Sequence, residues 1–346
     1  MQVKSEAAIA GFAAALGAVA VLASPARGDA VEDFYRGKQV RLVIGTEAGT
    51  SYDAYARTLA RHMPDNIPGK PTFVPQNMPG AGSLNTYNHL YNIAPRDGTA
   101  FGTGHRFVPL MPLLGMPGPK FDPSKFLYIG SINREIDICI ARADSGIRSI
   151  DDLKTKELMV GTTGAGAELT TFYATLSRML DAKLKVITGY RSTNDLYLAV
   201  QRGEIQGRCG DSYANFLNHF PDVERTKDVD AILQIGVIRD PAIPQVPSLI
   251  DLVRDENDRD ALRLMLAPSD MGRPYVGPPE VPPDRAAALR AAFDATVKNP
   301  NFIAEIRKQT LEVNPLGGAE MEALVSRAYQ TPEPIVARAR ALVNGE

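Results

Sequence analysis

The sequence lacks the short motifs that mark most enzyme active sites and metal centres. It has no Gly-x-x-x-x-Gly-Lys-Ser/Thr phosphate loop, no His-Glu-x-x-His zinc motif, no Cys-x-x-Cys pair and no Gly-x-Ser-x-Gly nucleophile elbow. Its histidines are scattered without the spacing of metal ligands. An enzyme needs a nucleophile, a base or a metal, and no convincing set is present. We therefore expect no catalysis, no metal and no cofactor.

An excess of positive charge is also absent. The 346 residues carry a formal net charge of -2, without a basic field or a polybasic cluster. Such a balance does not predict binding to nucleic acid or to anionic lipid. The hydrophobic content of 44% is that of an ordinary globular protein, and the length favours two domains. We expect a monomer.

Cysteine is scarce, with Cys139 and Cys209 alone in the chain, both in strand-like segments. In an exported protein an even number permits one disulfide. The alternative is two buried thiols that pack as small hydrophobic side chains. We predict the thiols, with the disulfide as the open alternative.

The first thirty residues differ from the rest of the chain. An apolar run extends from Ala7 to Ala23, and Gly28-Asp29-Ala30 offers small residues at the positions that a signal peptidase reads. We predict that residues 1–30 are a cleaved signal peptide. A permanent anchor is the alternative, because seventeen apolar residues can just span a bilayer. No cysteine lies near the site, so a lipid anchor is not expected.

A strand, a loop of small residues and a helix follow one another four times. A helix N-terminus has unpaired N–H groups and partial positive charge, so small residues there let an anion approach the backbone. Helix caps and tight turns explain each loop taken singly, but four in one chain favour a bound carboxylate or phosphate. Ligand sites in open α/β sheets lie where such loops gather. The loops span 48–53, 77–83, 162–167 and 189–193.

The alternation of strands and helices predicts an α/β protein with mainly parallel sheets. Prolines and caps divide the C-terminal third into helices, and an apolar stripe of Leu289, Phe293 and Val297 marks one of them. The expected strands cover 39–45, 72–76, 100–103, 136–141, 158–161, 186–187 and 205–209; the expected helices cover 51–63, 83–93, 168–180, 194–202 and 284–297.

The loop sequences resemble the periplasmic solute-binding proteins of tripartite tricarboxylate transporters, the Bug receptor family. The most specific match to this family is Asn77-Met78-Pro79-Gly80-Ala81-Gly82-Ser83. Weaker matches lie at 48–57, 94–99, 161–166, 203–205 and 244–248. Thr50 replaces a glycine of the family, and Tyr52 adds a bulky ring beside Asp53. Such departures indicate that the far end of the ligand differs from a simple dicarboxylate.

The resemblance implies a two-domain periplasmic-binding-protein fold (Venus-flytrap, type II) with two crossovers, near Ile132–Glu135 and Gly236–Arg239. The expected domains are 31–134 plus 238–346, and 135–237. It also implies a receptor that binds a small organic acid in the interdomain cleft and delivers it to a membrane permease. Two alternatives remain: an exported α/β enzyme acting on a small anion, and a ligand-binding sensor that feeds a two-component kinase.

The candidate ligand-binding residues come from the loops of both expected domains. Arg106 and Arg191 are the candidates for a charge-assisted contact with the acid, which is stronger than a neutral one. Asp53 is expected either to organise its own loop or to touch the ligand. The full set is Thr50, Ser51, Tyr52, Asp53, Ala81, Gly82, Ser83, His105, Arg106, Thr163, Ala165, Arg191 and Asp211.

Overall fold

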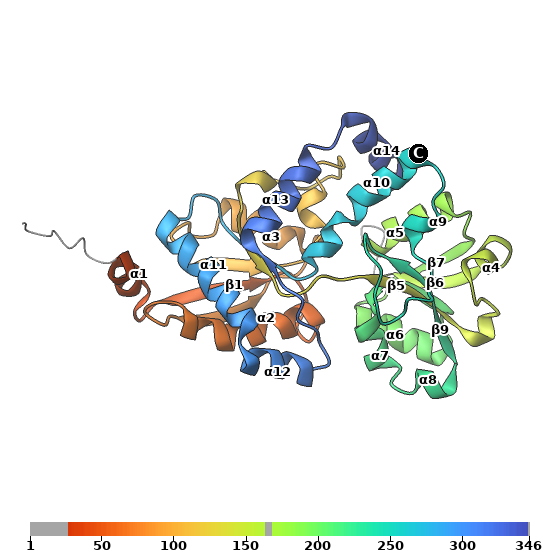
Figure 1. The fold of residues 1–346 in the computed structure, drawn as a ribbon, viewed down its shortest axis with the longest axis horizontal. Helices are drawn as coiled ribbons and strands as arrows, with labels where there is room; N and C mark the ends of the chain where they lie inside the picture. The colour runs from red at the N-terminus through yellow and green to blue at the C-terminus, as the bar shows by residue number, and fades with distance from the viewer. Residues whose placement is uncertain (1–26, 163–167, 345–346) are drawn as a thin grey trace, which may run out of the picture.

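The structure, a computed structural model, describes residues 27–162 and 168–344. Two lobes lie side by side, each built on its own sheet (Figure 1). The predicted signal peptide lies outside the described residues except for its last four, which open helix α1 (Arg27–Tyr35). Among the described residues, no helix has the length and apolar character needed to cross a membrane.

The first lobe is built on a six-stranded sheet in the order β11-β4-β10-β3-β1-β2. Strand β1 pairs in parallel with β2 and β3, whereas β10 runs antiparallel to both β3 and β4. The strands are β1 (Gln39–Ile44), β2 (Thr72–Asn77), β3 (Ala100–Thr103), β4 (Leu127–Ser131), β10 (Pro274–Gly277) and β11 (Leu316–Gly317). The helices are α1, α2 (Ser51–His62), α3 (Leu84–Asn92), α11 (Pro283–Lys298), α12 (Pro300–Lys308) and α13 (Gly318–Tyr329).

The second lobe is built on a five-stranded sheet in the order β7-β6-β8-β5-β9. Strand β6 pairs in parallel with β7 and β8, and β5 runs antiparallel to β8 and β9. The strands are β5 (Asp137–Arg142), β6 (Leu158–Thr162), β7 (Leu184–Thr188), β8 (Gly207–Ser212) and β9 (Val229–Ile235). The helices are α4 (Ile150–Thr155), α5 (Glu168–Met179), α6 (Thr193–Arg202), α7 (Tyr213–His219), α8 (Val223–Thr226) and α9 (Leu249–Leu252).

Each sheet has a hydrophobic core on both faces. In the first lobe α3 and α13 cover one face, while α1, α2, α11 and α12 cover the other. In the second lobe α4, α5 and α9 cover one face, and α6, α7 and α8 the other. The α/β prediction is confirmed, but the expectation of mainly parallel sheets is wrong. Both sheets are mixed, because β10 and β11 in the first sheet and β5 and β9 in the second run antiparallel to their neighbours. The expected strands and helices appear within a few residues of their predicted bounds, and residues 163–167 of the third loop lie outside the described residues.

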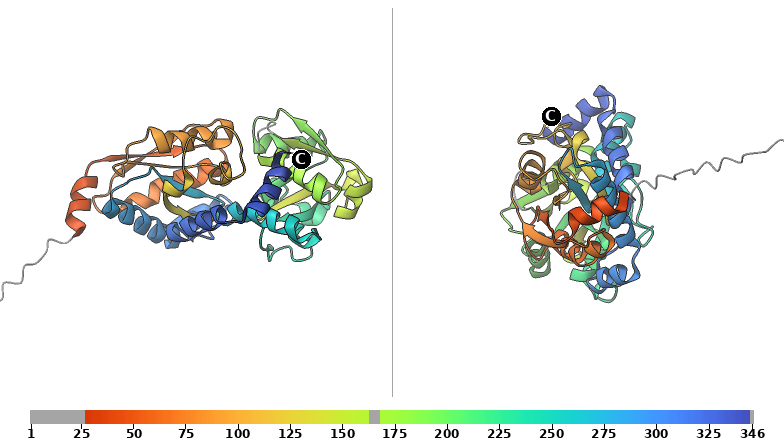
Figure 2. Two further views of the ribbon diagram at one scale, coloured as in Figure 1. Left: turned by 90° about the horizontal axis from the view of Figure 1, so that it is seen from above. Right: turned by 90° about the vertical axis from the view of Figure 1, so that its left-hand side faces the viewer.

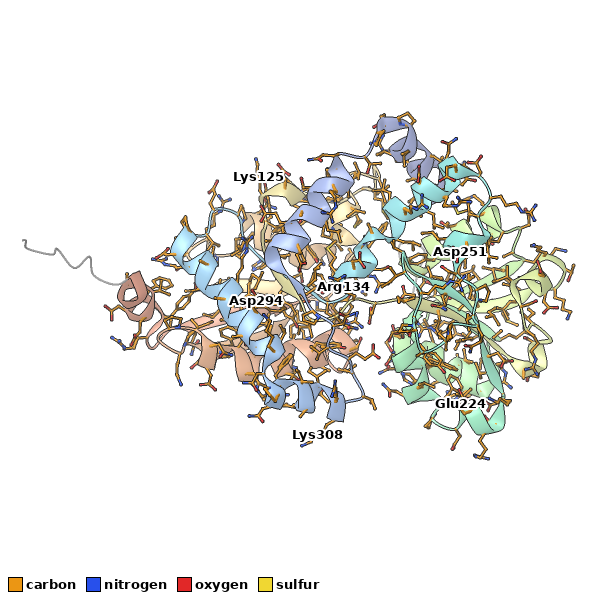
Figure 3. The ribbon with its side chains drawn as sticks, in the orientation of Figure 1. Lys125, Arg134, Glu224, Asp251, Asp294 and Lys308 are labelled. Carbon is orange, nitrogen blue, oxygen red and sulfur yellow. A yellow bond between two sulfur atoms is a disulfide. The ribbon has the colours of Figure 1, made fainter. Side chains whose placement is uncertain are left out.

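The chain passes between the lobes at the segment between β4 and β5. Arg134 lies there, between the lobes (Figure 3). The return comes at β10, because residues after β9 still pack on the second sheet: the Gln234 amide donates to the carbonyls of Ile243 and Val246. The crossover expected near Gly236–Arg239 thus lies inside a segment that contacts the second lobe. The domain boundaries themselves remain a prediction.

Besides the two crossovers, helices α10 (Glu256–Leu266) and α14 (Glu333–Asn344) join the lobes by packing against both of them. Helix α10 contributes Leu264 to a core of the first lobe and Leu262 to a core of the second. Helix α14 packs on α10 and α5, and Arg178 of α5 donates to the carbonyl of Leu342. Figure 2 shows the C-terminal segment between the two lobes. Any movement of one lobe against the other must therefore bend or slide this pair of helices.

Cys139 and Cys209 form a disulfide, so the prediction of two free thiols is wrong. The physical reason is the strand pairing: β5 and β8 run antiparallel in the centre of the second sheet, in a register that sets Cys139 directly opposite Cys209. The two residues are 70 positions apart in the sequence. Local sequence patterns do not reveal the register between β5 and β8, so they could not show that the two cysteines face each other.

Candidate functional site

A cleft of about 690 Å³ lies between the lobes and is lined by residues of both. The first lobe contributes the loops that follow β1, β2 and β3, at the carboxyl ends of these parallel strands. The second lobe contributes the start of α6, the end of β8 and one side of α5. This is the position in which open α/β sheets bind ligands.

The first loop is organised by Asp53, which lies behind it and does not line the cleft. Its carboxylate accepts hydrogen bonds from Gly49 N at 2.9 Å, from Arg57 Nε at 2.9 Å and from the Asn77 amide at 2.9 Å. Thr50 caps α2 by accepting from Asp53 N. Asp53 is therefore a positioning residue, the first of the two roles expected for it.

Asp53 should make stability depend on pH. Burial alone would raise the pKa of its carboxyl, but the bonds from Arg57, Gly49 and Asn77 outweigh burial and hold the pKa below its ordinary value of 3.8. A lowered folded-state pKa stabilises the fold above the unfolded-state pKa, and this contribution is lost as the pH falls through the folded value. We expect Asp53→Asn to cost about 2 kcal/mol at pH 7 and much less near pH 3.

Urea denaturation at both pH values measures this dependence. Asp65→Asn is the matched control, since Asp65 is exposed and its ion-pair partner among the described residues is Lys70 alone, at 3.3 Å. It should change stability by less than about 0.5 kcal/mol. An equal loss at pH 7 and pH 3 for Asp53→Asn contradicts the assignment.

The second loop adopts an unusual backbone conformation. Four successive residues have positive φ: Gly80 at 128°, Ala81 at 46°, Gly82 at 61° and Ser83 at 71°. Non-glycine residues adopt this conformation at a cost, and such strain clusters at functional sites. Among the described residues, no protein group accepts the backbone N–H of Ala81 or Gly82, and both residues line the cleft. The turn therefore offers hydrogen-bond donors to a ligand.

Ser83 lines the cleft, but its hydroxyl is already used in holding the loops together. Ser83 Oγ donates to the Gly45 carbonyl at 2.8 Å and accepts from His105 N at 3.0 Å. Because Gly45 follows β1 and His105 follows β3, this one buried hydroxyl ties three loops. A glycine at position 45 is required, since an added Cβ would lie 2.7 Å from the Ser83 Cβ.

Tyr52 and His105 form part of the first-lobe wall of the cleft. Their rings meet edge to face with centroids 5.1 Å apart. The Tyr52 hydroxyl donates to the Gly272 carbonyl at 2.9 Å, and the Arg273 guanidinium lies 4.3 Å from the centre of the Tyr52 ring. The bulky Tyr52 ring beside Asp53 in the sequence thus packs against the segment just before β10, where the chain returns to the first lobe.

A cluster of four buried charges forms the floor of the cleft. Glu135 accepts from Arg106 Nη1 at 2.6 Å and from Arg273 Nη1 at 2.5 Å, and Arg106 also pairs with Asp137. All four side chains are at most 7% exposed. Arg106 was a candidate cation for the ligand, but two carboxylates already neutralise it.

Sequence reasoning missed three members of this cluster. Glu135 is the last residue of the predicted crossover and Asp137 follows it closely, so two acids beside an apolar strand were the available signal. Arg273 is 138 residues from Glu135, and no local pattern joins them. The cluster links both crossovers to the loop after β3.

In the second lobe the structure separates the roles of Arg191 and Asp211. Asp211 accepts from the buried Arg208 at 3.0 Å and from the Asn215 amide at 2.7 Å, so its carboxylate is already engaged. Arg191 is exposed, lines the cleft and forms no ion pair among the residues that the structure describes. The candidates Thr163 and Ala165 lie outside the described residues. Within those residues, no group of acids, histidines or cysteines is arranged to hold a metal ion.

The cleft gathers ten of the thirteen predicted site residues. Eight come from the first lobe and two from the second. They are Thr50, Ser51, Tyr52, Ala81, Gly82, Ser83, His105, Arg106, Arg191 and Asp211. Their contacts with a ligand remain a prediction.

No protein-family model matches the sequence. A curated protein of Cupriavidus necator, described as a UPF0065 protein in the gbd 5' region, is 27% identical over 309 residues, or 88% of this chain and 87% of that protein. The solved structure of periplasmic binding protein BugD is 20% identical with a TM-score of 0.67, covering 90% of this chain and 98% of BugD.

Two further solved structures match along almost their whole length. A TctC solute-binding protein from Polaromonas is 18% identical with a TM-score of 0.65, covering 90% of this chain and 100% of that protein. MatC from Rhodopseudomonas palustris, solved with bound malate, is 20% identical with a TM-score of 0.64, covering 88% of this chain and 99% of MatC. The chain therefore has the fold of the TctC and Bug periplasmic solute-binding proteins, as its loop motifs predicted.

Proposed function

We propose that this protein is a non-enzymatic periplasmic receptor that binds a small organic acid in the cleft and delivers it to the membrane permease of a tripartite tricarboxylate-type transporter. The observation that carries the proposal is the left-handed turn at Ala81–Ser83. Its Ala81 and Gly82 N–H groups line the cleft on the lobe facing Arg191, and within the described residues neither these donors nor Arg191 has a protein partner. The malate bound to the structural neighbour MatC supports a carboxylate as the ligand.

The first lobe would bind the carboxylate largely by main chain. The N-terminus of α2 adds partial positive charge and the Ser51 hydroxyl to the donors of Ala81 and Gly82. The Thr50 hydroxyl lines the cleft but already donates to the Glu47 carbonyl at 3.0 Å. Preformed donors of this kind need no rearrangement when the anion arrives. Arg191, from the facing lobe, would complete the contact.

Ligand binding would draw the lobes together, because the site has donors on both sides of the cleft. Hinge closure of this type is absorbed by a few residues in crossovers, here around Arg134 and Gly272. We expect small-angle X-ray scattering to give a smaller radius of gyration with a saturating ligand. Identical curves would contradict closure.

Export places such a receptor where it can meet its permease. In the proposal, residues 1–30 are removed as a signal peptide and the mature protein acts as a monomer. Mass spectrometry of the protein secreted into the periplasm tests the first point, with a mature N-terminus at Val31 as the expected result.

The experiment that tests the function is a ligand screen on stripped protein. The mature protein is unfolded and refolded to remove bound acid, and thermal melting is followed with mono-, di- and tricarboxylates and aromatic acids. A ligand at a hundred times its dissociation constant stabilises by about 2.7 kcal/mol, which shifts the melting temperature by several degrees. No shift with any acid, in protein shown to be folded, contradicts the proposal.

Arg191→Ala is expected to weaken binding of the acid at least tenfold, about 1.4 kcal/mol, because a charge-assisted contact is lost. Isothermal titration calorimetry measures the change. Arg202→Ala is the control, because Arg202 is an exposed arginine at the far end of α6, the helix that begins just after Arg191. Unchanged affinity in Arg191→Ala removes this residue from the site.

A further inference from the structure

The two halves of the cleft differ in chemistry. The half formed at the starts of α2 and α6 is polar, with Thr50, Ser51 and the segment 191–194. Figure 1 shows α2 and α6 on one side of the two sheets, and α3 and α5 on the other. The half formed by α3, α5 and the segment after β3 carries apolar side chains: Leu84, Val108, Met111, Met116, Leu169 and Phe172.

The apolar half is an extension of the protein core. Leu84 and Val108 belong to a core cluster of the first lobe, and the half-buried Met111 and Met116 pack against it. Phe172 belongs to a core cluster of the second lobe. Methionine is flexible and fits ligands of irregular shape. An apolar ligand group that covers these side chains removes both surfaces from water, which favours binding.

Among the charged side chains that line the cleft, one arginine has no carboxylate partner within the described residues. Among the described residues, three arginines face four carboxylates there: Arg106, Arg191 and Arg273, with Glu47, Glu135, Asp137 and Asp211. Glu135 and Asp137 neutralise Arg106 and Arg273. The buried Arg208, which does not line the cleft, neutralises Asp211. Arg191 is the arginine left without a carboxylate among these residues, and the exposed Glu47 is the carboxylate left without an arginine. A second carboxylate on the ligand would lose its hydration without gaining an unpaired cation.

We propose that the ligand is a monocarboxylic acid with an apolar body, an aliphatic chain or an aromatic ring, rather than a di- or tricarboxylate. Its carboxylate is held by the first two loops and Arg191, and its body lies against the apolar half of the cleft. This inference rests on the proposed function, because it specifies the ligand of the same receptor.

Hexanoate and adipate provide the decisive comparison, since they share a six-carbon chain and differ by one terminal carboxylate. Calorimetry on stripped protein should show hexanoate binding at least tenfold more tightly than adipate. In the series from butyrate to hexanoate, affinity should rise about fourfold for each methylene group buried. Phenylacetate, malate and citrate extend the test, and phenylacetate should bind more tightly than either polyacid.

The outcomes separate this inference from the function on which it rests. Tighter binding of adipate, malate or citrate than of the monoacids overturns the ligand class and leaves the carboxylate receptor standing. Absence of binding by every acid overturns both. A flat butyrate-to-hexanoate series overturns the contact between the ligand body and the apolar half.

A variant of the apolar half tests the contact directly. Met116→Gln should weaken hexanoate several-fold and butyrate much less, because the shorter chain buries less of this surface. Met179→Gln is the matched control, since Met179 is a half-buried methionine that does not line the cleft. If Met116→Gln fails to fold, Met111→Gln replaces it. Equal weakening of both acids would contradict the proposed position of the ligand body.

Discussion

Glu135→Gln is expected to lower the free energy of unfolding by about 3–5 kcal/mol, because it leaves a buried arginine without its counterion. The Glu135 side chain is 5% exposed and lies between two guanidinium groups. Arg106 keeps Asp137 as a partner, but Arg273 has no other carboxylate among its described contacts. Burial alone would lower the pKa of Arg273, but the Glu135 carboxylate, together with Tyr52 and Tyr55, outweighs burial and raises that pKa, so the guanidinium stays charged.

Urea denaturation of the ligand-free protein measures the loss. Glu305→Gln is a fair control, since Glu305 also contacts two side chains, Arg61 and His62, but is 34% exposed. Exposed ion pairs contribute at most about 1 kcal/mol. If the two variants lose the same small amount, the charged floor of the cleft does not stabilise the fold.

The same substitution should change which acid the cleft prefers. Removing the Glu135 charge leaves Arg273 uncompensated at the floor, beside Ser51 at 3.2 Å. Adipate should then gain affinity relative to hexanoate, because its second carboxylate finds a cation. A stable fraction of folded Glu135→Gln with unchanged relative affinities would show that the floor lies out of reach of the ligand.

The sequence predicted those parts of the fold that local signals determine. The alternating apolar residues at 39–45 and the small-residue helix start at Thr50 and Ser51 correspond to β1 and α2. The helix predicted at 194–202, after a loop of small residues, corresponds to α6 in the same way. Strand periodicity and helix capping act over a few residues, so one sequence is enough to detect them.

The charged floor could not be predicted, because it depends on contacts between distant segments. Arg106 was recognised as a cation near a strand end, but its partners lie 29 and 31 residues later, Glu135 in the crossover and Asp137 at the start of β5. Arg273 and Glu135 are separated in the sequence by the whole second lobe, and the fold brings them together. Local motifs therefore predicted the residues of the cleft loops. They did not predict the ion pairs of the floor, on which the proposed charge of the ligand depends.

Breaking the disulfide is expected to lower the free energy of unfolding by about 4 kcal/mol. The link closes a loop in the unfolded chain and so reduces the conformational entropy that the chain gains on unfolding. The loop spans 70 residues and contains most of the second lobe. Both cysteines are at most 2% exposed, so small apolar replacements are required. The variant is Cys139→Ala with Cys209→Val, and its urea midpoint is compared with that of the oxidised protein.

Reduction of the wild-type protein distinguishes loss of the link from loss of packing. If the loop is the cause, wild type unfolded in reductant should lose as much stability as the double variant, and the double variant should not respond to reductant. Strand β5 also carries Asp137 of the charged floor, and its partner β8 carries Asp211 of the cleft. The link therefore fixes two cleft carboxylates on one rigid pair of strands, and hexanoate affinity should fall several-fold when it is removed. Unchanged affinity in a destabilised double variant would mean that strand pairing alone positions these carboxylates.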